Sequence, residues 1–246
     1  MQDKYVGDIG DYGKLGLLRR LQAAGLTIGV NWYYNPGTGE KNAHGGLIDY
    51  LPYRPCDEPL FSSLQKIITE GSREITSLEN DSILPAVFYS KPLAYTGETR
   101  AERAALRQAW HEASLAQLRD VNVVFIDPDN GLLVSSAKNT RRDNKYVKPE
   151  ELEQYYNKLH ATVIYYQHKA RRKDQYYIDQ HKALMLNGCF PGVISLGLKF
   201  RPLSQRYYFF LIQPEHYAMV RTIVDEMLDS PWGQGDPPAF SELKQV

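Results

Sequence analysis

The residues best suited to chemistry follow an apolar run at residues 121–126. This run contains the β-branched and aromatic sequence Val-Val-Phe-Ile, which is typical of a strand buried on both faces. The strand is followed at once by a polar turn made of Asp127, Pro128, Asp129 and Asn130. Because open α/β folds bind ligands at the carboxyl ends of their strands, this turn is the first candidate site. The same residue types also favour an ordinary strand-ending turn.

Two kinds of chemistry could use this turn. In an amino methyltransferase, Asp127 and the following backbone carbonyl would accept hydrogen bonds from an exocyclic amine and orient its lone pair. In a metal-dependent nuclease or phosphoesterase, Asp127 and Asp129 would hold Mg²⁺ with a further carboxylate. The candidates for that carboxylate are Asp8, Asp11 and Asp49. The residues alone leave both mechanisms open.

Two glycine-containing segments nearer the start of the chain are further candidates. Residues 7–14 read Gly-Asp-Ile-Gly-Asp-Tyr-Gly-Lys and lead into a predicted helix, so the polar residues here could reach a ligand. The candidates for substrate contact or catalysis in this segment are Asp8, Asp11 and Lys14. As an alternative, Asp11 could cap the helix. The second segment follows a predicted strand and supplies the candidate cofactor-binding residues Asn35, Gly37, Gly39 and His44, although a plain Pro-Gly turn is also compatible with it.

Basic and aromatic residues gather in two predicted loops. One loop follows the polar turn, and the other follows a predicted strand at residues 161–166. If the two strands are neighbours, both loops lie at one edge of the sheet, where basic residues among aromatics suit a nucleic-acid substrate. Two solvated loops are the alternative. The candidate substrate-binding residues are Arg141, Arg142, Lys145, Tyr166, His168, Arg171 and Arg172.

Alternating helices and strands would position these residues. The expected helices span residues 14–24, 59–70, 99–119, 149–159, 174–186 and 215–228. The expected strands span residues 26–34, 83–89, 121–126, 161–166, 192–200 and 206–212. Short connections predict an α/β fold with a mostly parallel sheet and helices on both faces. Only five residues join the last two strands, so these should pair antiparallel. We expect one domain over residues 1–230 and a loosely ordered tail over residues 231–246.

The composition excludes several classes of protein. Of the 246 residues, 43% are hydrophobic and 24% are charged, as in an ordinary folded domain. The net charge is zero, so any attraction to nucleic acid must be local. Two cysteines without metal-ligand spacing argue against a disulfide framework and a structural zinc site. The polar start and the lack of a long apolar run predict a cytoplasmic protein without a membrane partner.

In its order of motifs, the chain resembles the RlmJ type of ribosomal RNA adenine N6-methyltransferase. That family opens with Gly-Asn-x-x-Asp-x-x-Lys, and Gly7, Asp11 and Lys14 match it. Its catalytic motif is Asp-Pro-Pro-Tyr after an apolar strand, and the first two residues of the polar turn match its first half. Asp and Asn replace the second proline and the tyrosine, so the aromatic residue that would stack on the target base is missing from the motif.

The resemblance implies a Rossmann-like methyltransferase fold with S-adenosylmethionine as the cofactor. It implies that Asp127 orients the amine, that Lys14 contacts the substrate and that residues 35–39 approach the cofactor. The leading hypothesis is therefore a methyltransferase-like enzyme acting on nucleic acid. The alternatives are a Mg²⁺-dependent nuclease or phosphoesterase and a catalytically inactive α/β module that binds nucleic acid.

Overall fold

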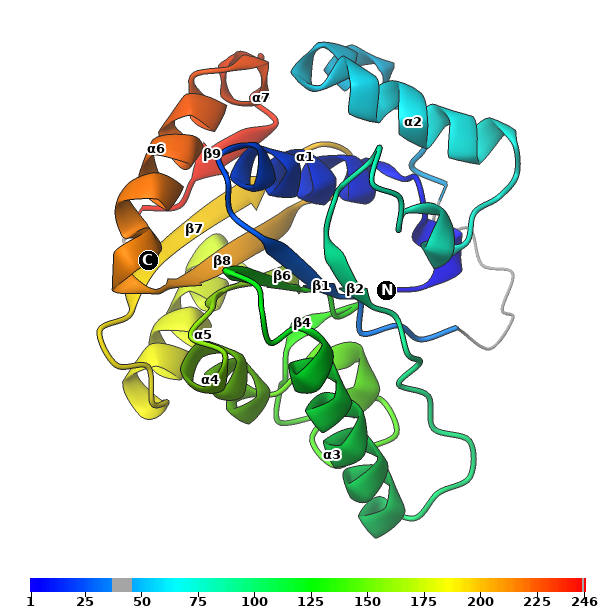
Figure 1. Ribbon diagram of the computed structural model, residues 1–246, viewed down its shortest axis with the longest axis vertical. Helices are drawn as coiled ribbons and strands as arrows, with labels where there is room; N and C mark the ends of the chain where they lie inside the picture. Colours follow the sequence, from blue (N-terminus) through cyan, green and yellow to red (C-terminus); the bar gives the residue numbers. More distant parts are fainter. Residues whose placement is uncertain (37–45, 245) are drawn as a thin grey trace.

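A seven-stranded sheet forms the centre of the protein (Figure 1). The computed structural model describes residues 1–36, 46–244 and 246. The strands of the sheet are β1 (Ile28–Asn31), β2 (Val87–Tyr89), β3 (Val123–Ile126), β6 (Thr162–His168), β7 (Ile194–Phe200), β8 (Arg206–Ile212) and β9 (Phe240–Glu242). Their order across the sheet is β2-β1-β3-β6-β8-β7-β9.

The directions of the strands confirm the α/β class and the mostly parallel sheet. Strands β2, β1, β3 and β6 pair in parallel, as short connections through helices require. Strand β8 pairs antiparallel with both β6 and β7, which confirms the antiparallel pair expected near the end of the chain. A separate small ribbon joins β4 (Gly131–Leu132) to β5 (Tyr146–Val147) just after the polar turn.

Helices cover both faces of the sheet (Figure 1). One face carries α1 (Ile9–Ala23), α2 (Glu58–Thr69), α6 (Tyr217–Leu228) and α7 (Pro231–Gln234). The other carries α3 (Arg100–Gln117), α4 (Pro149–Lys158) and α5 (Asp174–Asn187). Strand β3 supplies both cores, because Val123 and Phe125 point into the first and Val124 and Ile126 into the second. Within the described ranges, no helix is long and apolar enough to cross a membrane.

The first helix begins five residues earlier than the predicted residue 14. Asp8 is its N-cap, and the Asp8 Oδ1 atom accepts hydrogen bonds from the backbone N–H groups of Gly10 (2.7 Å) and Asp11 (3.1 Å). The helix therefore includes Gly10 and Gly13, two residues that normally predict a loop. Gly10 lies against the side chain of Arg206 and Gly13 against that of Phe200. Asp11 is a first-turn residue of α1 rather than its cap.

Residues 231–244 do not form the loosely ordered tail that the sequence predicts for the end of the chain. Ser230 caps α7, and β9 adds an antiparallel strand to β7 at the edge of the sheet. Trp232 is only 1% exposed and packs against Gly16, where even a Cβ atom would come within 2.3 Å of the indole ring. Burial of this large side chain holds the segment in place.

Candidate functional site

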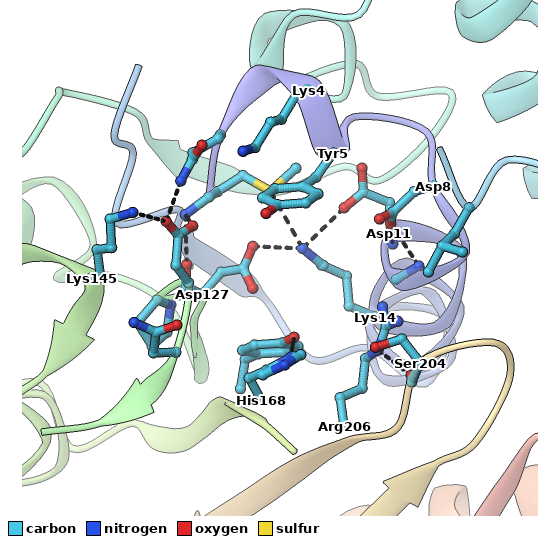
Figure 2. A pocket seen from close by; sticks show the side chains of 18 residues that line it. Lys4, Tyr5, Asp8, Asp11, Lys14, Asp127, Lys145, His168, Ser204 and Arg206 are labelled. Atoms are coloured by element: carbon cyan, nitrogen blue, oxygen red, sulfur yellow. Dashed lines mark hydrogen bonds and ion pairs between the residues drawn. The ribbon is translucent and has the colours of Figure 1, made fainter. Parts of the chain in front are cut away.

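A polar cavity of about 480 Å³ opens at the carboxyl ends of β3 and β6 (Figure 2). From β1 the chain first forms β2 on one side of β1 and then crosses to form β3 on the other side. The connections reverse direction between β1 and β3, and this switch point is where α/β folds bind ligands. The candidates from the sequence that line the cavity are Asp8, Asp11, Lys14, Asp127, Pro128, Asp129, Asn130, Lys145, Tyr166 and His168. The further lining residues are Met1, Gln2, Lys4, Tyr5, Gly10, Leu47, Ser204 and Arg206.

A buried lysine joins two carboxylates at the cavity wall. Lys14 Nζ donates a hydrogen bond to Asp127 Oδ2 at 2.5 Å and lies 3.0 Å from Asp11 Oδ1. The three side chains are at most 5% exposed, and Figure 2 shows the ammonium between the two acids. Asp11 and Lys14 are three residues apart on α1, so they share one face of the helix. The long-range pair links the first helix to the central strand β3.

The charges of this cluster do not cancel. Burial by itself would lower the pKa of Lys14, but Asp127 and Asp11 raise that pKa above its ordinary value and keep the ammonium charged. Burial raises the pKa of Asp11 to about 6 even though Lys14 opposes this shift. One cation thus neutralises one carboxylate fully, and Asp11 is the acid that can take up a proton near neutral pH.

Asp129 anchors the beginning of the chain to the polar turn. Its Oδ1 atom lies 3.0 Å from the Met1 ammonium, and Gln2 Nε2 donates to its Oδ2 atom at 2.6 Å. Burial alone would raise the pKa of Asp129, but the Met1 ammonium, Gln2 and Lys145 lower it below its usual value. The carboxylate is ionised and already paired with a cation.

The Met1 ammonium occupies an acceptor site at the switch point. It donates to the backbone carbonyl oxygens of Trp32 (3.0 Å), Tyr33 (3.2 Å) and Asp127 (3.1 Å). These carbonyls follow β1 and β3, the two strands on either side of the switch point. The ends of the two strands therefore form a ready set of oxygen acceptors for a positively charged amino group.

A glycine and a glutamine hold the end of the polar turn. Gly131 has φ +106°, and a Cβ atom there would come within 2.2 Å of the Gln167 side chain, so only glycine fits. Gln167 Nε2 donates to the carbonyl of Asn130 at 2.9 Å, and Gln167 Oε1 accepts from the N–H of Leu132 at 2.9 Å. These bonds tie the turn to β6 and fix where Asp127 and Asn130 lie.

Aromatic side chains form another part of the wall. Tyr5, in the short helix η1 (Asp3–Tyr5), and Tyr166, in β6, both line the cavity and are partly buried. The Tyr166 hydroxyl lies 3.3 Å from His168 Nδ1. Burial raises the pKa of Tyr166 to about 12 and lowers that of His168, so both groups are neutral at neutral pH. Tyr5 lies above the gap between Asp127 and Lys14 in Figure 2.

Several predicted site residues lie elsewhere. The exposed arginines that do not line the cavity are Arg141, Arg142, Arg171 and Arg172. Asn35 does not line it either, and its N–H donates to the carbonyl of Met1 at 2.9 Å. Gly37, Gly39 and His44 lie outside the described residues. In the described part of the chain, no group of three or more His, Cys, Asp or Glu residues could hold a metal ion.

Sequence reasoning missed Tyr5, Ser204 and Arg206. The position of Arg206 in the sequence did carry a signal. Arg206 begins β8, and because β8 runs antiparallel to β6, its first residue lies beside the end of β6. Tyr5 carried none, since nothing in its local sequence shows that η1 folds over the carboxyl ends of the strands. Neither the protein-family models nor the curated protein sequences that were compared with this chain match it.

Proposed function

We propose that the protein is an S-adenosylmethionine-dependent methyltransferase-like enzyme that methylates an amino group of a nucleic-acid base. The observation that carries the proposal is the position of Asp127, which directly follows β3 beside the switch point and is held by Lys14 at 2.5 Å. The strand order supports it. In that fold a mostly parallel sheet contains one antiparallel strand between the two strands that precede it in the chain, as β8 lies between β6 and β7.

The donors and acceptors of the site fit this cofactor. Its methionine part carries an α-amino group, and the carbonyls of Trp32 and Tyr33 already accept hydrogen bonds from an ammonium. The amino group of the bound cofactor would take the place of the Met1 ammonium at these oxygens. The cavity of about 480 Å³ also lies within the range of about 300–1,000 Å³ typical of small-molecule sites. When bound, S-adenosylmethionine supplies the methyl group that is transferred.

The chain's own residues would orient the acceptor amine. Among the described residues no donor bonds to Asp127 Oδ1, so this atom can accept an N–H of the amine and direct the nitrogen lone pair. Lys14 holds the other oxygen of the carboxylate and so fixes the direction in which Oδ1 points. Tyr5 and Tyr166 line the same cavity and can stack on a flat base, which is the task of the aromatic residue missing from the polar turn.

A nucleic-acid partner is supported by exposed basic residues in two loops that adjoin, along the chain, residues lining the cavity. Arg141 and Arg142 precede η4 (Asp143–Lys145), whose last residue lines the cavity, and Arg171 and Arg172 follow β6. Guanidinium groups in such loops pair with backbone phosphates. Among the described residues no observation favours the magnesium-dependent alternative, because Asp127 and Asp129 are each paired with a cation and belong to no group of three or more possible metal ligands.

Calorimetric titration with S-adenosylmethionine tests the cofactor. We expect saturable binding by the wild-type protein, and no binding at millimolar cofactor would overturn the proposal. Transfer of a labelled methyl group to RNA and DNA oligonucleotides tests the reaction. Asp127→Asn should still bind the cofactor but lose about 100-fold in transfer rate, because one oriented charge-assisted contact is lost. Asp120→Asn, whose side chain is 85% exposed, is the matched control and should behave like wild type.

A further inference from the structure

Arg206 is a buried cation that has no carboxylate partner among the described residues. The residue is only 5% exposed, yet it lines the cavity. Its Nε atom donates to the carbonyl of Ser204 at 3.0 Å. Among the residues that the structure describes, no carboxylate lies within ion-pair distance of its guanidinium, whereas Lys14 and the Met1 ammonium in the same cavity both have carboxylates. Two guanidinium nitrogens are therefore left for another partner.

The fold holds this guanidinium in place. Arg206 is the first residue of β8 and is paired in register with His168, the last residue of β6. The centre of its guanidinium lies 5.5 Å from the centroid of the Phe200 ring. A Cβ atom on Gly10 would come within 1.8 Å of Arg206 Nη1, so only glycine at this position of α1 leaves room for the guanidinium. Figure 2 shows Arg206 and Ser204 on the same side of the cavity, beyond Lys14.

A buried charge without a partner is unfavourable, and an anion from a bound molecule would compensate it. Arginine suits this task because its fork of N–H groups matches the two oxygens of a phosphate or a carboxylate. Asp8 is close enough for its charge to act on Arg206, but its Oδ1 atom caps α1 and, among the described residues, it forms no ion pair with the guanidinium. We propose that Arg206 is the anion-binding subsite of this cavity and holds a phosphate or carboxylate group of the bound molecule.

The proposed function offers two sources for this anion, and the choice between them rests on that function. One source is a backbone phosphate next to the target base. The other is the carboxylate of the amino-acid part of the cofactor. The subsite itself does not depend on methyl transfer, so a binding experiment can test it separately.

Two ligand pairs that differ by one anionic group distinguish the sources in calorimetric titrations. Adenosine and adenosine 5′-monophosphate differ by a phosphate, and 5′-methylthioadenosine and S-adenosylhomocysteine differ by the amino-acid part with its carboxylate. Wild-type protein should prefer the charged member of at least one pair. Arg206→Met should weaken binding of that member by roughly 10- to 100-fold and leave the uncharged member within about threefold, since hydrogen bonds to charged groups contribute that much.

Two further variants complete the test. Arg201→Met removes an exposed arginine at the start of the loop between β7 and β8 that does not line the cavity, and it should bind like wild type. Arg206→Lys keeps the charge but not the fork of N–H groups, and it should give an intermediate loss of affinity.

If Arg206→Met does not fold, the affinities of wild type and Arg206→Lys decide whether the subsite exists. Equal affinity of wild type for both members of each pair, or unchanged binding by the Arg206 variants, overturns the subsite. A preference without methyl transfer would retain the subsite and reject the proposed function.

Discussion

At the residue scale, the most consequential contact is the one between Lys14 and Asp127. It joins residues 113 positions apart, and both side chains are almost fully buried. Replacing one partner of a buried ion pair leaves the other charge without compensation, which costs more than the pair itself contributes. The stability of the protein and the geometry of its cavity therefore depend on the same contact.

We predict that Lys14→Met lowers the free energy of unfolding by about 3–5 kcal/mol, because it leaves Asp127 and Asp11 buried without their cation. Urea unfolding at neutral pH measures the change. The control is Lys66→Met, whose side chain is 72% exposed and lies 3.8 Å from Glu70, and we expect it to stay within about 0.5 kcal/mol. Comparable losses in the two variants would contradict the role given to Lys14.

The raised pKa of Asp11 predicts a pH dependence of stability. In the folded protein Asp11 binds its proton up to about pH 6, whereas the ordinary value is 3.8. Between these values the folded state holds more protons than the unfolded state, so the contribution of Asp11 to stability is full below pH 4 and is lost as the pH rises through 6.

Asp11→Asn removes this titration. Relative to the variant, wild-type protein should lose stability from pH 4 to pH 7 in urea unfolding experiments. Asp120→Asn serves as the control, because its exposed carboxylate should leave the wild-type profile unchanged. A constant difference between wild type and Asp11→Asn across this range would show that Asp11 titrates normally.

At the element scale, α7 and β9 belong to the core rather than to a tail. We predict that Trp232→Ala lowers the free energy of unfolding by about 3–5 kcal/mol, because it leaves a cavity beside Gly16 on α1. Leu186→Ala, at a side chain that is 84% exposed, should change stability by about 0.5 kcal/mol or less. Urea unfolding followed by circular dichroism compares them. If the two variants were equally stable, the segment would contribute little to the fold.

Most of the elements could be predicted from the sequence because each carries its own local signal. The expected helix over residues 99–119 is observed as α3, and Thr99 caps it together with Glu102 in a capping box. The run at 121–126 contains β3, and its alternate residues face opposite cores. The sequence does not predict that α1 begins at Ile9, because glycines normally disfavour helices and only the packing of Gly10 and Gly13 against Arg206 and Phe200 explains their place in it.

The candidate site could be predicted only in part, for the same reason. Asp127 directly follows β3 and Lys14 lies in the first turns of α1, so the order of the elements places both at one edge of the sheet. The roles of Tyr5 and Arg206 depend on how η1 folds over that edge and on the insertion of β8 between β6 and β7. Contacts of this kind have no local pattern, and the exposed arginines, which did form a pattern, lie outside the cavity.

At the scale of the whole molecule, the cavity is assembled from distant parts of the chain. It combines the segment before and within α1, the polar turn after β3, the end of β6 and the start of β8. The net charge of the protein is zero, so the selection of a ligand falls to these local groups rather than to a long-range field.

The place of β8 has a consequence for how the protein is made. β7 leaves the ribosome before β8, yet β8 is the strand that lies between β6 and β7. A nascent chain therefore cannot complete the sheet in the order of translation, and β7 must wait for the next strand to enter as the second half of a hairpin. Because Arg206 begins that strand, this part of the cavity wall forms only when β8 has entered the sheet.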